Sequence, residues 1–219
     1  GDISVESNLS VDFGFYLPVT VGDRVWYDYN GDGAQARLQA NSTAELGVPG
    51  VSVSLYNAAT SQMVLLNGNP AITATDSHGL YLFERLPPGE YYVIFDLDTL
   101  PSAYLTTILN AVDVTEADNS DAVPTTGQTR NTGFLAGGSK DFDLDLGIYQ
   151  SASIGNYAWF DLNKDGLKDD DEPGVAGITV NLYNVQGNLV ATTLTDRNGY
   201  FQFAGLTPGD YYLAFIPPP

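Results

Sequence analysis

The sequence predicts an all-β protein built from tandem antiparallel β-sandwich repeats. Three observations predict this fold class: the 219-residue chain repeats itself, its apolar runs are short and bounded by turn residues, and no long segment has helical periodicity. The chain can bury a core, because 43% of its residues are hydrophobic and it contains 14 Tyr, 10 Phe and 2 Trp. Intrinsic disorder is therefore not expected.

The repeat is visible in four segments of the first copy that recur in the second. Residues 21–33, 50–57, 75–79 and 86–92 match residues 154–166, 177–184, 195–199 and 206–212. The offset between the copies falls from 133 to 127 and then to 120, so the first copy is longer by 6 and then 7 residues. Both changes fall where loops are expected, and loops tolerate insertions.

A further match defines the boundaries of the units. Residues 11–16 match residues 144–149, which close the first full copy, at the same offset of 133. The sequence therefore predicts that residues 1–17 are the closing strand of a preceding repeat. Residues 18–149 are predicted to be a complete β-sandwich repeat, and residues 150–219 a second repeat truncated before its closing strand.

The strands within each copy are short. Residues 51–56 alternate apolar and polar side chains, as do residues 178–183, which is the period of a half-buried strand. Residues 80–83 and 91–95 are aromatic and β-branched, and so are their counterparts in the second copy. Residues 97–139 predict a long polar connection with at most two short strands.

Charge and composition exclude several classes of function. The chain has 27 acidic and 8 basic side chains and a formal net charge of −19, so it repels phosphate backbones and we expect no nucleic-acid partner. No apolar run approaches about 18 residues, so no membrane insertion is expected. The absence of Cys excludes disulfides and zinc–thiolate sites. Divalent cations are the obvious counter-charge.

The clearest chemical motif is the acidic loop at residues 161–172. Oxygen side chains occupy positions 1, 3, 5, 9 and 12 of this loop, with glycine at position 6: Asp161, Asn163, Asp165, Asp169, Glu172 and Gly166. This is the spacing of an EF-hand calcium loop, in which position 7, here Leu167, donates a backbone carbonyl and position 12 binds through both oxygens. An acidic, solvated loop is the alternative, but six matched positions favour Ca²⁺ as a cofactor.

The first copy departs from this pattern. Asp28, Asn30 and Asp32 occupy positions 1, 3 and 5, but position 12 is Gln39. The repeat alignment instead pairs Glu45 with Glu172, so we expect Glu45 to fold back as the ligand that binds through both oxygens. A vestigial loop held by Asx-turns is the alternative.

A second acidic cluster lies in the long connection, at residues 116–121. We predict Asp118 and Asp121 as ligands of another ion, together with a loop carboxylate. A solvated turn remains an equal alternative.

No motif supports an enzyme. The only histidine, His78, stands in a turn where the second copy has Asn198, so it is a poor candidate for a general base. The sequence contains neither a Gly-x-Ser-x-Gly elbow nor a phosphate-binding glycine loop.

These motifs resemble the calcium-binding B repeats of serine-aspartate-repeat surface proteins, within the wider collagen-adhesin B-type (Cna B-like) group of Ig-like sandwiches. The resemblance rests on residues 21–33 and 154–166, on Thr-Asp-x-x-Gly-x-Tyr-x-Phe at 75–83, and on Asp-x-Gly-x-Tyr at 145–149. It implies a calcium-stiffened structural stalk module of a bacterial adhesin, located at the cell surface or in a secreted fibre. It also implies the ligand roles given above for the two acidic loops.

The expected partners are neighbouring repeats of the same array or fibre, with a host or matrix protein or a glycan as a further candidate. Two alternative functions stay open. In the first, the chain is a subunit of an extracellular fibre assembled by β-strand complementation, in which residues 11–16 complete a neighbouring sandwich. In the second, it is a carbohydrate- or protein-binding module whose site uses residues unique to the first copy, such as Leu65, Leu66 and the 100–109 stretch.

Overall fold

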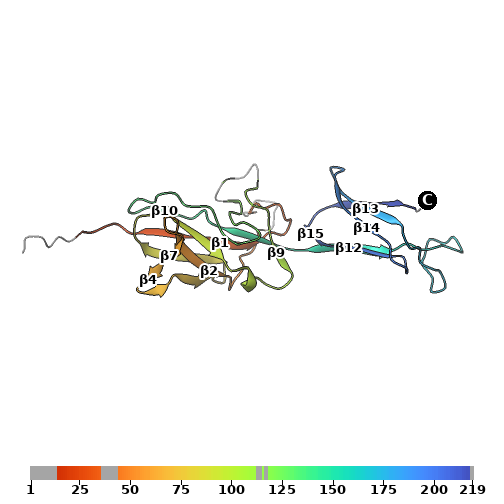
Figure 1. Cartoon of the computed structure of the whole chain (residues 1–219), viewed down its shortest axis with the longest axis horizontal. Coiled ribbons are helices and arrows are strands. Elements are labelled where there is room, and N and C mark those ends of the chain that lie inside the picture. The colour runs from red at the N-terminus through yellow and green to blue at the C-terminus, as the bar shows by residue number, and fades with distance from the viewer. Residues whose placement is uncertain (1–13, 36–43, 112–114, 116–117, 218–219) are drawn as a thin grey trace, which may run out of the picture.

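The structure, a computed structural model, describes residues 14–35, 44–111, 115 and 118–217. The described residues form strands and one 3₁₀ turn, η1 (Leu97–Thr99), and contain no α-helix. Figure 1 shows the strands gathered in two units that follow one another along the long axis of the molecule. The all-β prediction is confirmed.

The first unit contains a sheet centred on β1 (Val19–Tyr27). On one edge β1 pairs antiparallel with β7 (Leu80–Leu86), and on the other it pairs in parallel with β10 (Lys140–Asp141) and β11 (Leu146–Gln150). β11 pairs antiparallel with β9 (Tyr104–Thr106). The parallel pairs are a detail that the strand patterns did not predict. They arise because the long connection crosses over and returns the closing strand in the direction of the first strand.

The second sheet of this unit is centred on β2 (Ser52–Asn57). It pairs antiparallel with β8 (Tyr91–Phe95) on one edge, and with β3 (Gln62–Met63) and β6 (Ile72–Ala74) on the other. A small hairpin of β4 (Leu65–Leu66) and β5 (Asn69–Pro70) extends beside it.

The core of the first unit lies between these two sheets. Alternate residues of β2, β7 and β8 are buried, as the period of two predicts. The inward residues meet on a cluster that includes Leu55, Phe83, Phe95, Leu146 and Ile148. Trp26 is also fully buried.

The second unit repeats part of this plan. β12 (Ala152–Tyr157) pairs antiparallel with β15 (Tyr200–Leu206), and β13 (Thr179–Asn184) lies between β14 (Leu189–Leu194) and β16 (Tyr211–Ile216). The Ile154–Phe203 pair reproduces the Val21–Phe83 pair of the first unit. The core is smaller, with five buried residues: Val180, Leu182, Phe201, Phe203 and Leu206.

The predicted unit boundaries remain predictions. Residues 1–13 lie outside the described residues, and residues 14–17 form no strand. Among the residues that the structure describes, no helix has the length and apolar character needed to cross a membrane.

Candidate metal centres

The acidic loop of the second copy, residues 161–172 (the second loop), connects β12 to β13. Its side-chain oxygens accept hydrogen bonds from backbone N–H groups a few residues ahead. Asp161 Oδ2 accepts from Gly166 at 3.0 Å, Asn163 Oδ1 from Asp165 at 2.9 Å, and Asp165 Oδ1 from Leu167 at 2.8 Å. These bonds wind the loop back on itself.

Glu172 closes the second loop. This residue is buried, with 5% exposure. Oε1 accepts from the backbone N–H of Leu162 at 2.7 Å, and Oε2 accepts from that of Asp169 at 3.2 Å. Both oxygens of position 12 are thus held against positions 2 and 9, which is the presentation that a ligand binding through both oxygens requires.

The amide of Asn163 gathers two other predicted ligands. Its Nδ2 donates to Asp165 Oδ2 and to Asp169 Oδ2, each at 3.0 Å. Asp161 Oδ1 is buried without a hydrogen-bond partner. Carboxylate oxygens thus gather around the Asn163 amide, and the buried Asp161 oxygen has no hydrogen-bond partner. Such a set of oxygen ligands fits a hard dication such as Ca²⁺. The side chain of Leu167 is exposed, which leaves its backbone carbonyl as the group available for the predicted role.

The corresponding loop of the first copy, residues 28–35 (the first loop), has the same hydrogen-bond pattern. Asn30 Nδ2 donates to Asp32 Oδ2 at 2.7 Å, and Asp32 N donates to Asn30 Oδ1 at 3.3 Å. Asp28 is fully buried. Its carboxylate accepts from the N–H groups of Gly31 and Gly33 at 2.7 and 2.8 Å, and from the hydroxyl of Thr107 at 2.5 Å.

Glu45 lies where the repeat alignment places it. The N–H of Tyr29, at position 2 of the first loop, donates to Glu45 Oε1 at 3.0 Å, just as Leu162 donates to Glu172. Glu45 is buried, with 3% exposure. Gln39, the residue at the nominal position 12, lies outside the described residues. The two glutamates therefore have equivalent positions although the first copy is longer between loop and glutamate.

The second acidic cluster lies against the first loop. Gln35 N donates to the carbonyl of Asp118 at 2.6 Å, and Ser120 N donates to that of Gly33 at 3.1 Å. Glu116 lies outside the described residues. The backbone of Asp118 is thus brought beside the first loop, and its role as a ligand stays a prediction.

Asp121 points to a different environment. Its Oδ1 lies 3.4 Å from Arg130 Nε, and its backbone N–H donates to the carbonyl of Asp145 at 3.1 Å. Burial raises the pKa of Asp145 to about 10, with further contributions from the charges of Asp23 and Asp121 and from a hydrogen bond with Asp23. Asp121 thus lies beside Arg130 and the Asp23–Asp145 pair, and its role as a ligand stays a prediction.

Sequence reasoning missed the Asp23–Asp145 pair. A signal for Asp145 was present, because Asp12 recurs at the matching place in residues 11–16. In the described part of the chain, no three acidic or histidine side chains lie close enough together to hold a metal as they stand. An ion in the second loop would require these side chains to move closer together.

The first loop also lies at the junction of the two units. A Cβ added to Gly31 would lie 2.9 Å from Cδ of Pro208, in the second copy. A cavity of about 410 Å³ follows this junction, and its lining includes Asp28, Tyr29, Ser151 and Pro208. The first loop therefore lies against the second unit as well as within the first.

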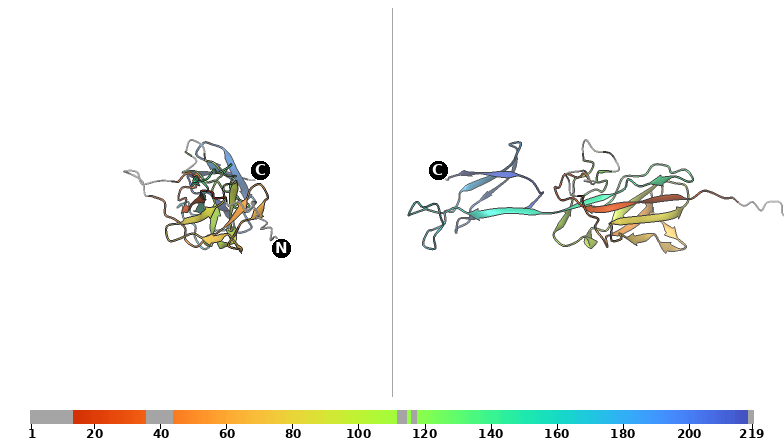
Figure 2. Two further views of the ribbon diagram at one scale, coloured as in Figure 1. Left: turned by 90° about the vertical axis from the view of Figure 1, so that its left-hand side faces the viewer. Right: turned by 180° about the vertical axis from the view of Figure 1, so that it is seen from behind.

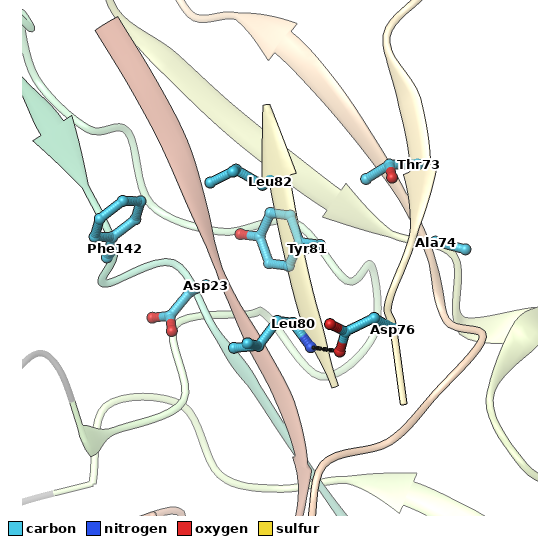
Figure 3. Close-up of a pocket in the computed structure, with 8 residues that line it drawn as sticks. All are labelled: Asp23, Thr73, Ala74, Asp76, Leu80, Tyr81, Leu82 and Phe142. Atoms are coloured by element: carbon cyan, nitrogen blue, oxygen red, sulfur yellow. Dashed lines mark hydrogen bonds between the residues drawn. The ribbon is translucent and has the colours of Figure 1, made fainter. Parts of the chain in front are cut away.

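A groove of about 600 Å³ lies on the first unit, away from the loops, and Figure 3 shows its lining. Leu80, Leu82 and Phe142 line it and are about half exposed. Asp76 lies at one side and accepts a hydrogen bond from Leu80 N at 2.9 Å. The residues singled out from the sequence, Leu65, Leu66 and 100–109, are not part of its lining.

Comparison with known proteins agrees with these shared motifs. A family model described as the SdrD B-like domain matches residues 19–148 and 152–219. The chain belongs to this family. The resemblance to B repeats of serine-aspartate-repeat proteins is thereby confirmed.

Two relatives show how the chain relates to longer proteins. It is 36% identical over 222 residues to serine-aspartate repeat-containing protein F of Staphylococcus epidermidis, covering 100% of this chain and 11% of that protein. It is 37% identical over 220 residues to protein D of Staphylococcus aureus strain Newman, covering 99% of this chain and 15% of that protein. The chain thus spans a small part of these relatives.

Solved structures are more distant. A streptococcal ancillary pilin aligns with a TM-score of 0.37 and 13% identity, over 93% of this chain and 54% of that one. The Bacillus anthracis TIE protein aligns with a TM-score of 0.38 and 15% identity, over 92% and 29%.

Proposed function

We propose that this chain is a non-enzymatic, calcium-stiffened stalk module of a bacterial extracellular surface protein or adhesin, displayed at the cell surface or in a secreted fibre. One observation carries the proposal. Two acidic loops in equivalent places, after the first strand of each unit, share one hydrogen-bond pattern, and each is closed by a buried glutamate.

The proposed ligands of the second loop are those of the EF-hand spacing: Asp161, Asn163, Asp165, the carbonyl of Leu167, Asp169 and Glu172. In the first loop they are Asp28, Asn30, Asp32 and Glu45, with Asp118 beside them. Bound Ca²⁺ supplies two positive charges to carboxylates that otherwise repel one another. The chain's own groups, mainly backbone N–H donors, hold these carboxylates in a nearly wound loop before the ion arrives.

Stiffening follows from where the first loop lies. The N–H of Asp28 donates to the carbonyl of Ile148 in β11 at 2.7 Å, and β11 is joined to β12 through Ser151 alone. Gly31 meets Pro208 of the second unit. A first loop held rigid by an ion would therefore restrain β11 in the first unit. It would also restrain the connection between β15 and β16 in the second unit, which contains Pro208.

The direct test is calorimetric titration of the whole chain with Ca²⁺, combined with melting curves with and without chelator. We expect at least one site for each loop and a marked fall in melting temperature when chelator is present. Identical melting curves in calcium and in chelator would exclude the mechanism.

The groove of Figure 3 supports a second candidate, a carbohydrate- or protein-binding module. Its exposed Leu80, Leu82 and Phe142 would contact an apolar face, and Asp76 would bind a polar or basic group. Backbone donors from Leu80 and His78 lower the pKa of Asp76, so it is ionised at neutral pH. Glycan-array and pull-down screens distinguish this candidate from a stalk that binds nothing.

A further inference from the structure

We propose that the groove of Figure 3 binds an extended, basic peptide segment of another protein, which adds to the open edge of β7 as a further strand. The inference rests on the second candidate function given above and names its partner. β7 pairs with β1 on one edge, and no strand that the structure describes pairs with its other edge. The groove lies at β7, because Leu80, Tyr81 and Leu82 line it. An unpaired strand edge is a template for an added strand.

The hydrogen bonds of β7 show which of its backbone groups face the open edge. Val25 N of β1 donates to Gly79 O at 2.9 Å, and the register from there to Phe83 is unbroken. In an antiparallel pair, every second residue exchanges hydrogen bonds with the partner strand. Tyr81 and Phe83 therefore direct their N–H and C=O groups toward β1. Leu82, between them, directs its N–H and C=O groups toward the open edge.

The open stretch of this edge is short and is limited at both ends. At one end the N–H of Asp76 donates to Leu80 O at 2.9 Å, and Leu80 N donates to Asp76 Oδ1 at 2.9 Å. At the other end Arg85 has a φ of 60°, and the register with β1 shifts between Val19 and Val21, which bends the strand. Such limits oppose the continued growth of a sheet. The edge is therefore suited to one short peptide strand.

The side chains of the groove fit a peptide better than a glycan. Leu80, Leu82 and Phe142 are about half exposed, and the alternate side chains of an extended peptide would cover them. The ammonium of Lys140 already lies 5.8 Å from the centroid of the Phe142 ring. The hydroxyl of Tyr81, the other aromatic residue of the lining, donates to a backbone carbonyl. Both rings are thus engaged within the protein, which leaves few groups for a sugar.

The charge of the groove favours a basic partner. Among the described residues that line it, Asp23 and Asp76 are acidic and none is basic. The N–H groups of His78 and Leu80 donate to Asp76 Oδ1 at 2.8 and 2.9 Å. Asp76 is exposed, so its Oδ2 is accessible to an ammonium or guanidinium group. The formal net charge of −19 also attracts a basic segment.

The groove stays accessible when units follow one another along a chain. All of its lining residues belong to the first unit. In Figures 1 and 2 the second unit lies beyond one end of the first unit and not over β7. A peptide at β7 therefore occupies the side of the molecule, where it does not compete with a neighbouring unit.

The test uses the full chain and a set of synthetic peptides of about six residues, the ordinary length of a strand. Valine, leucine or phenylalanine alternates with threonine in these peptides. Arginine stands at the carboxyl end, where an antiparallel strand would meet Asp76. A matched set has glutamate in place of arginine. Fluorescence anisotropy of the labelled peptides measures binding in chelator, so the result does not depend on calcium.

Methylated peptides test the backbone contact. Successive N–H groups of a strand point to opposite sides, so N-methyl groups on one alternate set of amides face β7 and those on the other set face away. We expect the first modification to weaken binding about tenfold and the second to have little effect. Hydrogen exchange followed by NMR should show the Leu82 amide protected in the complex, with the amide of its counterpart Gln202 unchanged.

Matched variants test the side chains. Asp76→Asn keeps an oxygen acceptor for the turn and removes the charge. Asp196→Asn makes the same change in the second copy, where Asp196 accepts from Tyr200 N at 2.9 Å. We expect about fivefold weaker binding for Asp76→Asn at low salt and no change for Asp196→Asn. Leu82→Gln introduces the residue that the second copy has at this place, Gln202, and should also weaken binding about fivefold.

The possible results separate this inference from the proposed functions. Equal binding of the two methylated peptides would overturn strand addition and retain a protein-binding groove. Equal binding of the arginine and glutamate sets would overturn the basic partner. Glycan binding that Leu82→Gln abolishes, with no peptide bound, would overturn the inference and retain the second candidate function. If no peptide and no glycan binds, both fail, and calcium titration still decides the stalk mechanism.

Discussion

Replacing Thr107 with valine removes one hydrogen bond from a buried carboxylate without opening a cavity. The Thr107 hydroxyl donates to Asp28 Oδ2, and both residues are buried. Asp28 keeps the N–H donors of Gly31 and Gly33. A hydrogen bond to a charged group contributes about 2 kcal/mol, and about 1 kcal/mol shifts the melting temperature of a domain of this size by about 2–4 °C. Without calcium, the transition of the first unit should fall by about 4–8 °C.

The same substitution should weaken calcium binding at the first loop. Thr107 contacts a proposed ligand and not the ion, and the loss of such a supporting group typically costs about 10–100-fold in affinity. Calorimetry on the whole chain measures this, with the second loop as an internal control that should keep its affinity. Unchanged melting in chelator together with unchanged affinity at both loops would refute the reasoning.

Three further predictions follow from other contacts. Glu172→Gln should lower calcium affinity at the second loop by at least about a hundredfold and leave the first loop unchanged in calorimetry, because one of the two oxygens held by Leu162 and Asp169 becomes an amide. In chelator, the Asp145→Asn variant should gain stability relative to the wild type as pH rises from 5 to 9. The folded-state pKa of Asp145 is raised to about 10 by burial and then by neighbouring charges, so its contribution is complete below about pH 4 and is lost as pH rises toward 10. Urea denaturation at several pH values measures this, and parallel curves for the two proteins would contradict it. Gly147→Ala should destabilise the first unit by about 1–3 kcal/mol, since its Cβ meets Trp26 and Thr107, whereas Gly14→Ala should leave the melting of the monomer unchanged.

The repeat made much of the architecture predictable. Alternating residues in 51–56 and 178–183 predicted strands that are found at β2 and β13, because each strand buries one face on a core. The alignment also paired Glu45 with Glu172, and the structure gives both carboxylates the same donor at loop position 2. The spacing of residues in the sequence therefore predicts the conformation of a loop whose hydrogen bonds join residues a few positions apart.

Contacts between distant segments were not predictable in this way. The Thr107–Asp28 bond joins residues 79 positions apart, and the Asp23–Asp145 pair depends on the parallel return of the closing strand beside β1. No periodicity in residues 97–139 reveals this crossover. The position of Asp121 beside Arg130 depends on the same connection, so the residues next to Asp121 in the sequence did not reveal this contact.

The two loops differ in a way that their sequences do not show. The second loop matches the EF-hand spacing at more positions, but Asp161 has one backbone donor and a buried oxygen without a partner. Asp28 accepts from three donors and is tied to the closing strand through Ile148. A loop that is already ordered loses less conformational freedom when an ion binds. The copy with the weaker motif is therefore the better prepared site.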